Sequence, residues 1–185
     1  TTSLLYAEGL LTRKKTNDLY FPLSGYSLLY GLRVAAESLA SDTSFAQARA
    51  AAEWLNQVGE DGRVILRAGL GGMVVGDFDA LPPELRFFAG GDRSIRGFDY
   101  QQIGDTNAEG EVIGGEYEIV ASAEYEHYFL KNWGAAIFVD AGDAFTQEFD
   151  ANVGAGIGLR WKSPGGLVRV EGARAVVSGF DHSWP

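Results

Sequence analysis

The chain alternates apolar and polar residues with a period of two over several long stretches. Between Gly25 and Glu37, for example, the even positions are mostly large and apolar, whereas the odd positions include Ser27 and Arg33. This alternation places successive side chains on opposite faces of a β-strand. The same pattern predicts further strands at residues 63–70, 117–126, 133–140, 153–161 and 167–173. The sequence therefore predicts an all-β protein.

Two segments near the N-terminus are less regular. Residues 45–58 alternate alanines with polar residues, as a strand would, but alanine favours helix and the alanines and Trp54 also fit a helical stripe. We predict a strand there. Residues 1–11 are also predicted to be a strand, although Glu8 shares a face with apolar residues.

Strand length separates two all-β architectures. Stretches of ten or more residues are long for a soluble sandwich, whose strands usually have about five or six, but they suit a membrane barrel, whose strands have about 9–11. We therefore predict an antiparallel transmembrane β-barrel with about eight strands in this chain. A soluble sandwich with a binding loop is the alternative. No stretch reaches the ~18 apolar residues of a spanning helix.

Composition excludes several functions. The chain has 25 acidic and 15 basic residues and a net charge of −10, which argues against nucleic-acid binding. It has no cysteine, so it has neither disulfides nor thiolate metal ligands. The run G-A-G-I-G at residues 154–158 lacks the helix that follows a dinucleotide-binding turn. Its glycines instead leave space for something packed against that strand. We expect no enzyme activity, no metal and no cofactor.

A long loop interrupts the strand pattern at residues 77–115. Loops of this length in a compact unit are usually functional or disordered. The loop contains R-F-F-A-G-G-D-R-S-I-R-G-F-D-Y at residues 86–100. Its central positions are the candidate site residues Gly90, Gly91, Asp92, Arg93, Ile95, Arg96, Gly97 and Phe98.

Arg96 is the most informative residue of this loop. It lies between apolar neighbours, so it must pair with an acid if the loop tip is buried. Glu124 and Asp140, on the polar faces of their strands, are the predicted partners; a solvated surface arginine is the alternative. Other charges on the polar faces, such as Arg63 and Arg160, are expected to be tolerated by a wide, wet interior.

The string G-G-D-R-S-I-R-G-F resembles the loop signature of the BamA and TamA superfamily of outer-membrane barrels. In that family an Arg-Gly-Phe or Arg-Gly-Tyr tripeptide lies on a loop folded back into the lumen. The longer string F-F-A-G-G-D-R-S-I-R-G is most similar to the TamA branch. Further matches to the family pattern are S-A-E-Y at 122–125, F-V-D-A-G at 138–142, G-I-G-L-R-W at 156–161 and S-P-G-G at 163–166.

The resemblance implies that residues 1–185 are the C-terminal half, short of its closing strand, of a barrel of about 16 strands, with the 77–115 loop in the lumen. We therefore expect an open, curved half-barrel whose first and last strands need other strands. The resemblance also implies a factor in the outer membrane of a Gram-negative bacterium that inserts or secretes other proteins without covalent chemistry. The implied partners are outer-membrane lipid, client outer-membrane or secreted proteins, and a periplasm-spanning inner-membrane protein. The alternatives are a BamA-like insertase, a two-partner secretion pore and, less favoured, a passive porin-type channel.

Overall fold

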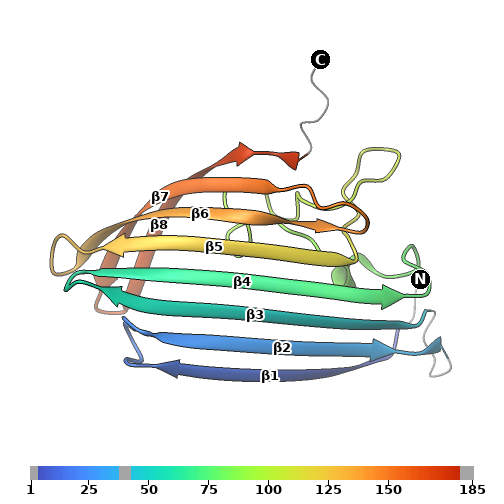
Figure 1. The fold of residues 1–185 in the computed structure, drawn as a ribbon, viewed down its shortest axis with the longest axis horizontal. Helices are drawn as coiled ribbons and strands as arrows, with labels where there is room; N and C mark the ends of the chain where they lie inside the picture. The colour runs from blue at the N-terminus through green and yellow to red at the C-terminus, as the bar shows by residue number, and fades with distance from the viewer. Residues whose placement is uncertain (1–3, 38–42, 180–185) are drawn as a thin grey trace, which may run out of the picture.

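The computed structural model describes residues 4–37 and 43–179, which contain eight strands in a single antiparallel sheet. The strands follow one another in sequence order across the sheet (Figure 1). They are β1 (Tyr6–Thr16), β2 (Gly25–Ala35), β3 (Phe45–Val58), β4 (Gly62–Val75), β5 (Tyr117–His127), β6 (Trp133–Phe145), β7 (Asn152–Ser163) and β8 (Gly166–Val177). The predicted all-β fold is confirmed. No helix among the described residues is long and apolar enough to span a membrane.

The two ambiguous segments are both strands. Residues 45–58 form β3, which pairs along its length with β2 and β4, so the alternating pattern prevails over the helix preference of alanine. The N-terminal strand was expected at residues 1–11, of which 1–3 lie outside the described residues. It runs instead from Tyr6 to Thr16, because its basic end continues to pair with β2. Glu8 faces Arg33 across this pair, with Nε donating to Oε1 at 2.9 Å.

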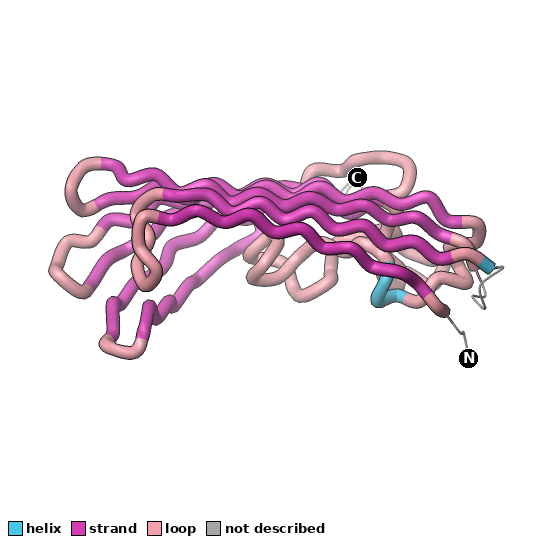
Figure 2. The backbone as a smooth tube through the Cα atoms, turned by 90° about the horizontal axis from the view of Figure 1, so that it is seen from below, coloured by secondary structure: helices cyan, strands magenta, loops and turns pink. Residues whose placement is uncertain are grey.

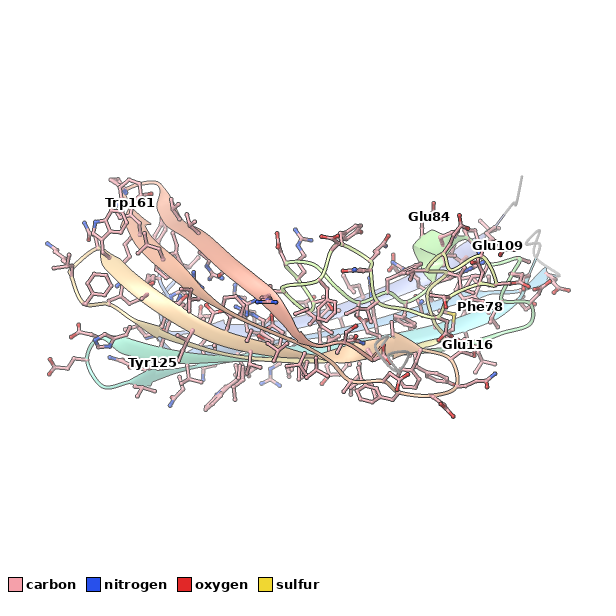
Figure 3. The ribbon with its side chains drawn as sticks, turned by 90° about the horizontal axis from the view of Figure 1, so that it is seen from above. Phe78, Glu84, Glu109, Glu116, Tyr125 and Trp161 are labelled. Atoms are coloured by element: carbon pink, nitrogen blue, oxygen red, sulfur yellow. The ribbon has the colours of Figure 1, made fainter. Side chains whose placement is uncertain are left out.

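The sheet is open and curved. β1 and β8 are its two edges and do not pair with each other in the described part of the chain. The sheet bends towards the side that carries the long loop, residues 76–116 (Figure 2), and the strands that turn most are β7 and β8, orange to red in Figure 3. We call this side the inner face. Each edge strand presents a row of N–H and C=O groups without partners in the sheet.

The opposite side, the outer face, is apolar. It exposes many large side chains, including Leu11, Leu32, Leu70, Ile137, Ile157 and Val170. The buried core lies instead on the inner face, beneath the long loop, and includes Phe45, Met73, Leu85, Phe87, Ile95 and Ile103. A soluble monomer rarely exposes so extensive an apolar surface, so the outer face requires an apolar environment.

The two ends of the sheet differ. At one end the connections are short, at residues 17–24, 59–61, 128–132 and 164–165; the other end carries the long loop and residues 146–151. Tyr125 and Trp161 lie at the short-turn end, far from Phe78 and Glu84 (Figure 3). Trp133 and Trp161 stack there with their ring centroids 5.7 Å apart. Tyr117 and Phe145 form an aromatic pair at the other end of the sheet, the end that carries the long loop.

Candidate functional site

The long loop packs its buried apolar residues against the inner face of the sheet. Within the loop, Phe87 bridges to Gly115 and Ala89 bridges to Ile103, which gives it a small antiparallel framework. Gln47 of β3 donates from Nε2 to the Leu85 carbonyl at 2.6 Å. These contacts fix the part of the loop that contains the predicted site residues.

The loop motif forms a compact turn that directs Arg96 towards the sheet. The N–H of Gly91 donates to the carbonyls of Ile95 and Phe98, both at 3.2 Å, and Gly91 has a φ of 93° that favours glycine. Gly90 donates to the Ser94 hydroxyl at 3.3 Å. Asp92 and Arg93 are exposed at the tip, whereas Ile95 and Phe98 are buried.

Gly97 brings the loop against the edge of the sheet. Its φ is 98°, and a Cβ atom there would lie 2.5 Å from the main-chain carbon of Arg174 in β8. Only glycine fits both the conformation and the approach. The Arg-Gly-Phe tripeptide therefore contacts β8 through its main chain.

The structure brings Arg96 together with both predicted acids. Its main-chain N and its Nε donate to Oδ2 of Asp140 at 3.0 and 2.7 Å, and its Nη2 donates to Oδ1 at 2.9 Å. Nη1 donates to Oε2 of Glu124 at 2.9 Å. The guanidinium also lies over the ring of Phe138, 3.4 Å from its centroid. Arg96 is 6% exposed, so the alternative of a solvated arginine is wrong.

A second arginine extends this arrangement along the inner face. Arg160 donates from Nη2 to Glu124 Oε1 at 2.6 Å and from Nε to Glu126 Oε1 at 2.7 Å. The other oxygen of Glu126 accepts from Nε of Arg63 at 2.7 Å. Glu171 of β8 accepts from Arg160 Nη2 at 2.5 Å and from Arg96 Nη1 at 3.2 Å. The ion network thus connects the loop to five neighbouring strands, β4 to β8.

The buried part of the network contradicts the expectation of a wide, wet interior around these charges. Arg63, Glu124, Glu126, Asp140 and Arg160 are each at most 2% exposed. They are tolerated because the guanidinium groups of Arg63, Arg96 and Arg160 face the carboxylates of Glu124, Glu126 and Asp140. Buried charges require this kind of pairing and hydrogen bonding.

The turn at residues 17–24 covers the network at the short-turn end. The ring of Phe21 lies 5.1 Å from that of Tyr128, edge to face, and the Lys162 ammonium lies 3.8 Å from the Phe21 ring centroid. Arg63 Nη1 donates to the Pro22 carbonyl at 2.5 Å. The inward side of this turn was not identified from the sequence; the one signal available for it is the apolar Phe-Pro pair at residues 21–22.

Electrostatics keep the loop arginine charged. Burial alone would lower the pKa of Arg96, but its hydrogen bonds and charge interactions with Asp140 and Glu124 raise that pKa above its ordinary value. Arg96 therefore stays positively charged and holds the loop against the sheet. Burial lowers the pKa of Arg86, which donates to the carbonyls of Leu81 at 2.9 Å and Ile113 at 3.1 Å. Among the described residues, no cluster of His, Cys, Asp or Glu could hold a metal.

Comparisons with known proteins agree with this geometry. The family model described as the Omp85 superfamily domain matches residues 2–178. One solved structure similar to this chain is BamA from Haemophilus ducreyi lacking POTRA domains 1–3. It has a TM-score of 0.77 and 21% sequence identity, over 94% of this chain. This chain spans 40% of the length of that structure. At this identity the similarity shows a shared fold.

Proposed function

This chain belongs to the Omp85 superfamily, and from this we propose that it is part of an outer-membrane barrel in a Gram-negative bacterium that assembles or translocates other proteins. The proposal involves no covalent chemistry. The observation that carries it is the loop motif fastened through Arg96 to Glu124 and Asp140, on the inner face of a sheet whose outer face is apolar. This arrangement suits a barrel with a loop held inside it.

Residues 1–185 are then the C-terminal part of one barrel domain, with the loop at 77–115 in its lumen. Two observations support this division. Both β1 and β8 are unpaired edges within the described residues, and the chain matches 40% of a longer barrel structure. Additional strands would satisfy the exposed edge groups, as a membrane environment requires.

The outer face supports placement in a lipid bilayer. Aromatic side chains mark both ends of its apolar surface, as in barrels whose aromatic girdles lie at the membrane interfaces. The short connections then face the periplasm and the long loop starts from the extracellular side, following the usual asymmetry of these barrels. Outer-membrane lipid is accordingly one partner.

The mechanism is strand pairing at an exposed edge. In the complete barrel, a weak junction between the first and last strands would allow an incoming client strand to pair with free backbone groups by β-augmentation. Clients are outer-membrane or secreted proteins. β8 is the strand of this chain closest to that junction, and Glu171 links it to the loop arginine.

Within the family, the extended string F-F-A-G-G-D-R-S-I-R-G favours a TamA-like factor with a periplasm-spanning inner-membrane partner. A BamA-like insertase and a two-partner secretion pore are the alternatives on the same fold. A passive porin-type channel is less favoured because the loop covers much of the inner face and buries Ile95 and Ile103 completely.

The test uses the complete protein in lipid vesicles. Its effect on the folding of an unfolded client barrel protein is followed by the gel-mobility shift of the folded client. We expect Arg96→Ala to slow client folding, with Arg93→Ala as the matched control, since Arg93 is an exposed arginine of the same loop. Heat-dependent gel mobility verifies that both variants are folded. Vesicles that conduct ions freely but do not accelerate client folding would support the porin alternative instead.

A further inference from the structure

The inner face of β7 carries glycine at three alternate positions. Gly154, Gly156 and Gly158 point inwards, while the residues between them are on the outer face. They belong to the G-A-G-I-G run, for which the proposed function has no role. Glycine weakens a strand interior, so three in alternation require a compensating contact.

Gly154 receives the main chain of the loop. A Cβ atom at this position would overlap the carbonyl oxygen of Arg96 and would lie 3.5 Å from Cγ2 of Ile95. The obstacle is backbone, which cannot rotate away as a side chain can. Any side chain at residue 154 would therefore lift the loop from the sheet.

Gly156 supports the guanidinium of Arg96 through an intermediate ring. It pairs across the sheet with Phe138, and a Cβ at residue 156 would overlap the end of the Phe138 ring and the Gly172 carbonyl. That same ring lies 3.4 Å from the Arg96 guanidinium carbon. A side chain at residue 156 would push the ring into the space of the guanidinium.

Gly158 makes room for Arg160, but less strictly. A Cβ there would overlap Nη1 of Arg160 and would lie 3.1 Å from Cγ of Glu171. Both atoms belong to side chains and not to the main chain, so they can adjust more than the backbone that faces Gly154. The three glycines therefore differ in how firmly they exclude a methyl group.

We propose that Gly154 and Gly156 are positioning residues, which fix where the loop motif packs on the sheet. Gly154 sets the depth of the loop main chain, and Gly156 sets the Phe138 ring against which the guanidinium packs. They act through Arg96 and contact no client. The proposal concerns loop position alone, so it stands or falls separately from the assembly function.

The experiment compares Gly154→Ala with Gly172→Ala in the complete protein. Gly172 lies on the neighbouring strand β8, and a Cβ there would meet nothing within 4 Å. The chain has no cysteine, so Ile95→Cys, at a fully buried loop position, serves as the reporter. We expect Gly154→Ala to increase maleimide labelling of residue 95 roughly tenfold or more by shifting the loop towards an open state. Gly172→Ala should leave labelling unchanged, and equal labelling in both variants would overturn the proposal.

A second arm separates loop packing from strand formation. Residues 86–104 are replaced by a short flexible linker, and the urea midpoint of unfolding is measured with and without Gly154→Ala. We expect the substitution to lower the midpoint only while the loop is present, which is the coupling a double-mutant cycle detects. If Gly154→Ala prevents folding only with the loop present, the proposal is supported. If it destabilises or prevents folding equally without the loop, the glycine serves the strand and the proposal is wrong.

Discussion

The ring of Phe21 lies 4.3 Å from the guanidinium carbon of Arg63, over a side chain that is 2% exposed. Phe21 comes from the turn between β1 and β2, whereas Arg63 is at the start of β4. Tyr20, the preceding residue, is 96% exposed. One side of the turn thus covers the ion network and the other side faces solvent.

Removing this cover is expected to destabilise the protein. Phe21→Ala should lower the free energy of unfolding by about 1–3 kcal/mol, less than for a fully buried ring, because Phe21 is half-buried. Tyr20→Ala is the neighbouring control and should change it by less than about 0.5 kcal/mol. Urea unfolding in detergent micelles measures both. Similar effects from the two variants would show that the turn does not support the network.

Breaking the loop ion pair should cost more than breaking an exposed one. Asp140→Asn leaves the buried Arg96 without its bidentate partner, which typically costs about 3–5 kcal/mol. Glu8→Gln, in the more exposed pair with Arg33, should cost less than about 1 kcal/mol. Unfolding midpoints of the two variants provide the comparison, and equal losses would contradict the central role of Asp140.

Arginine at residue 96 should not be replaceable by lysine. Arg96→Lys keeps the positive charge but loses the fork that reaches Asp140 with two nitrogens and Glu124 with a third. We expect limited trypsin digestion to cut the long loop of the variant faster than that of the wild type. The controlled comparison is Arg93→Lys, at the exposed tip. Wild-type resistance in Arg96→Lys would show that charge alone holds the loop.

The short-turn end of the outer face, where Trp133 and Trp161 stack, should lie at a membrane interface. In vesicles, lipids brominated near the carbonyl groups should quench the stacked Trp133 and Trp161 more strongly than lipids brominated near the chain ends. Phenylalanine substitutions at the other tryptophans isolate the signal. Efficient quenching by aqueous iodide, with none by brominated lipid, would contradict placement of the outer face in a membrane.

The open edges predict a gradient of amide exchange in residues 1–185 prepared alone. β1 and β8 should exchange faster than the central strands β4 and β5, which are paired on both sides. Mass spectrometry of peptides from each strand measures this. Uniform protection of β1 and β8 would indicate that the two edges have closed on each other.

The strands could be predicted from the sequence more completely than the contacts between residues that are distant in the sequence. The alternation in residues 45–58 predicted β3 correctly, although its alanines also fitted a helix, because strand faces depend only on neighbouring positions. Arg96 could be matched to Glu124 and Asp140 from its charge and apolar neighbours. The burial of Arg160 and Glu126 could not be predicted, because it depends on the register between strands and on an inward-facing turn. Neither is encoded in a short window of sequence.

The contact between Arg96 and Glu171 also constrains the order of folding. The two residues are 75 positions apart, and Glu171 lies on β8, the final strand of the sheet. Contacts of such long sequence separation form slowly, because closing the chain between them costs conformational entropy. The strands β1 to β4 can pair before any of this occurs. Complete docking of the loop therefore requires β8, and a fully docked loop signals that the final hairpin is in place.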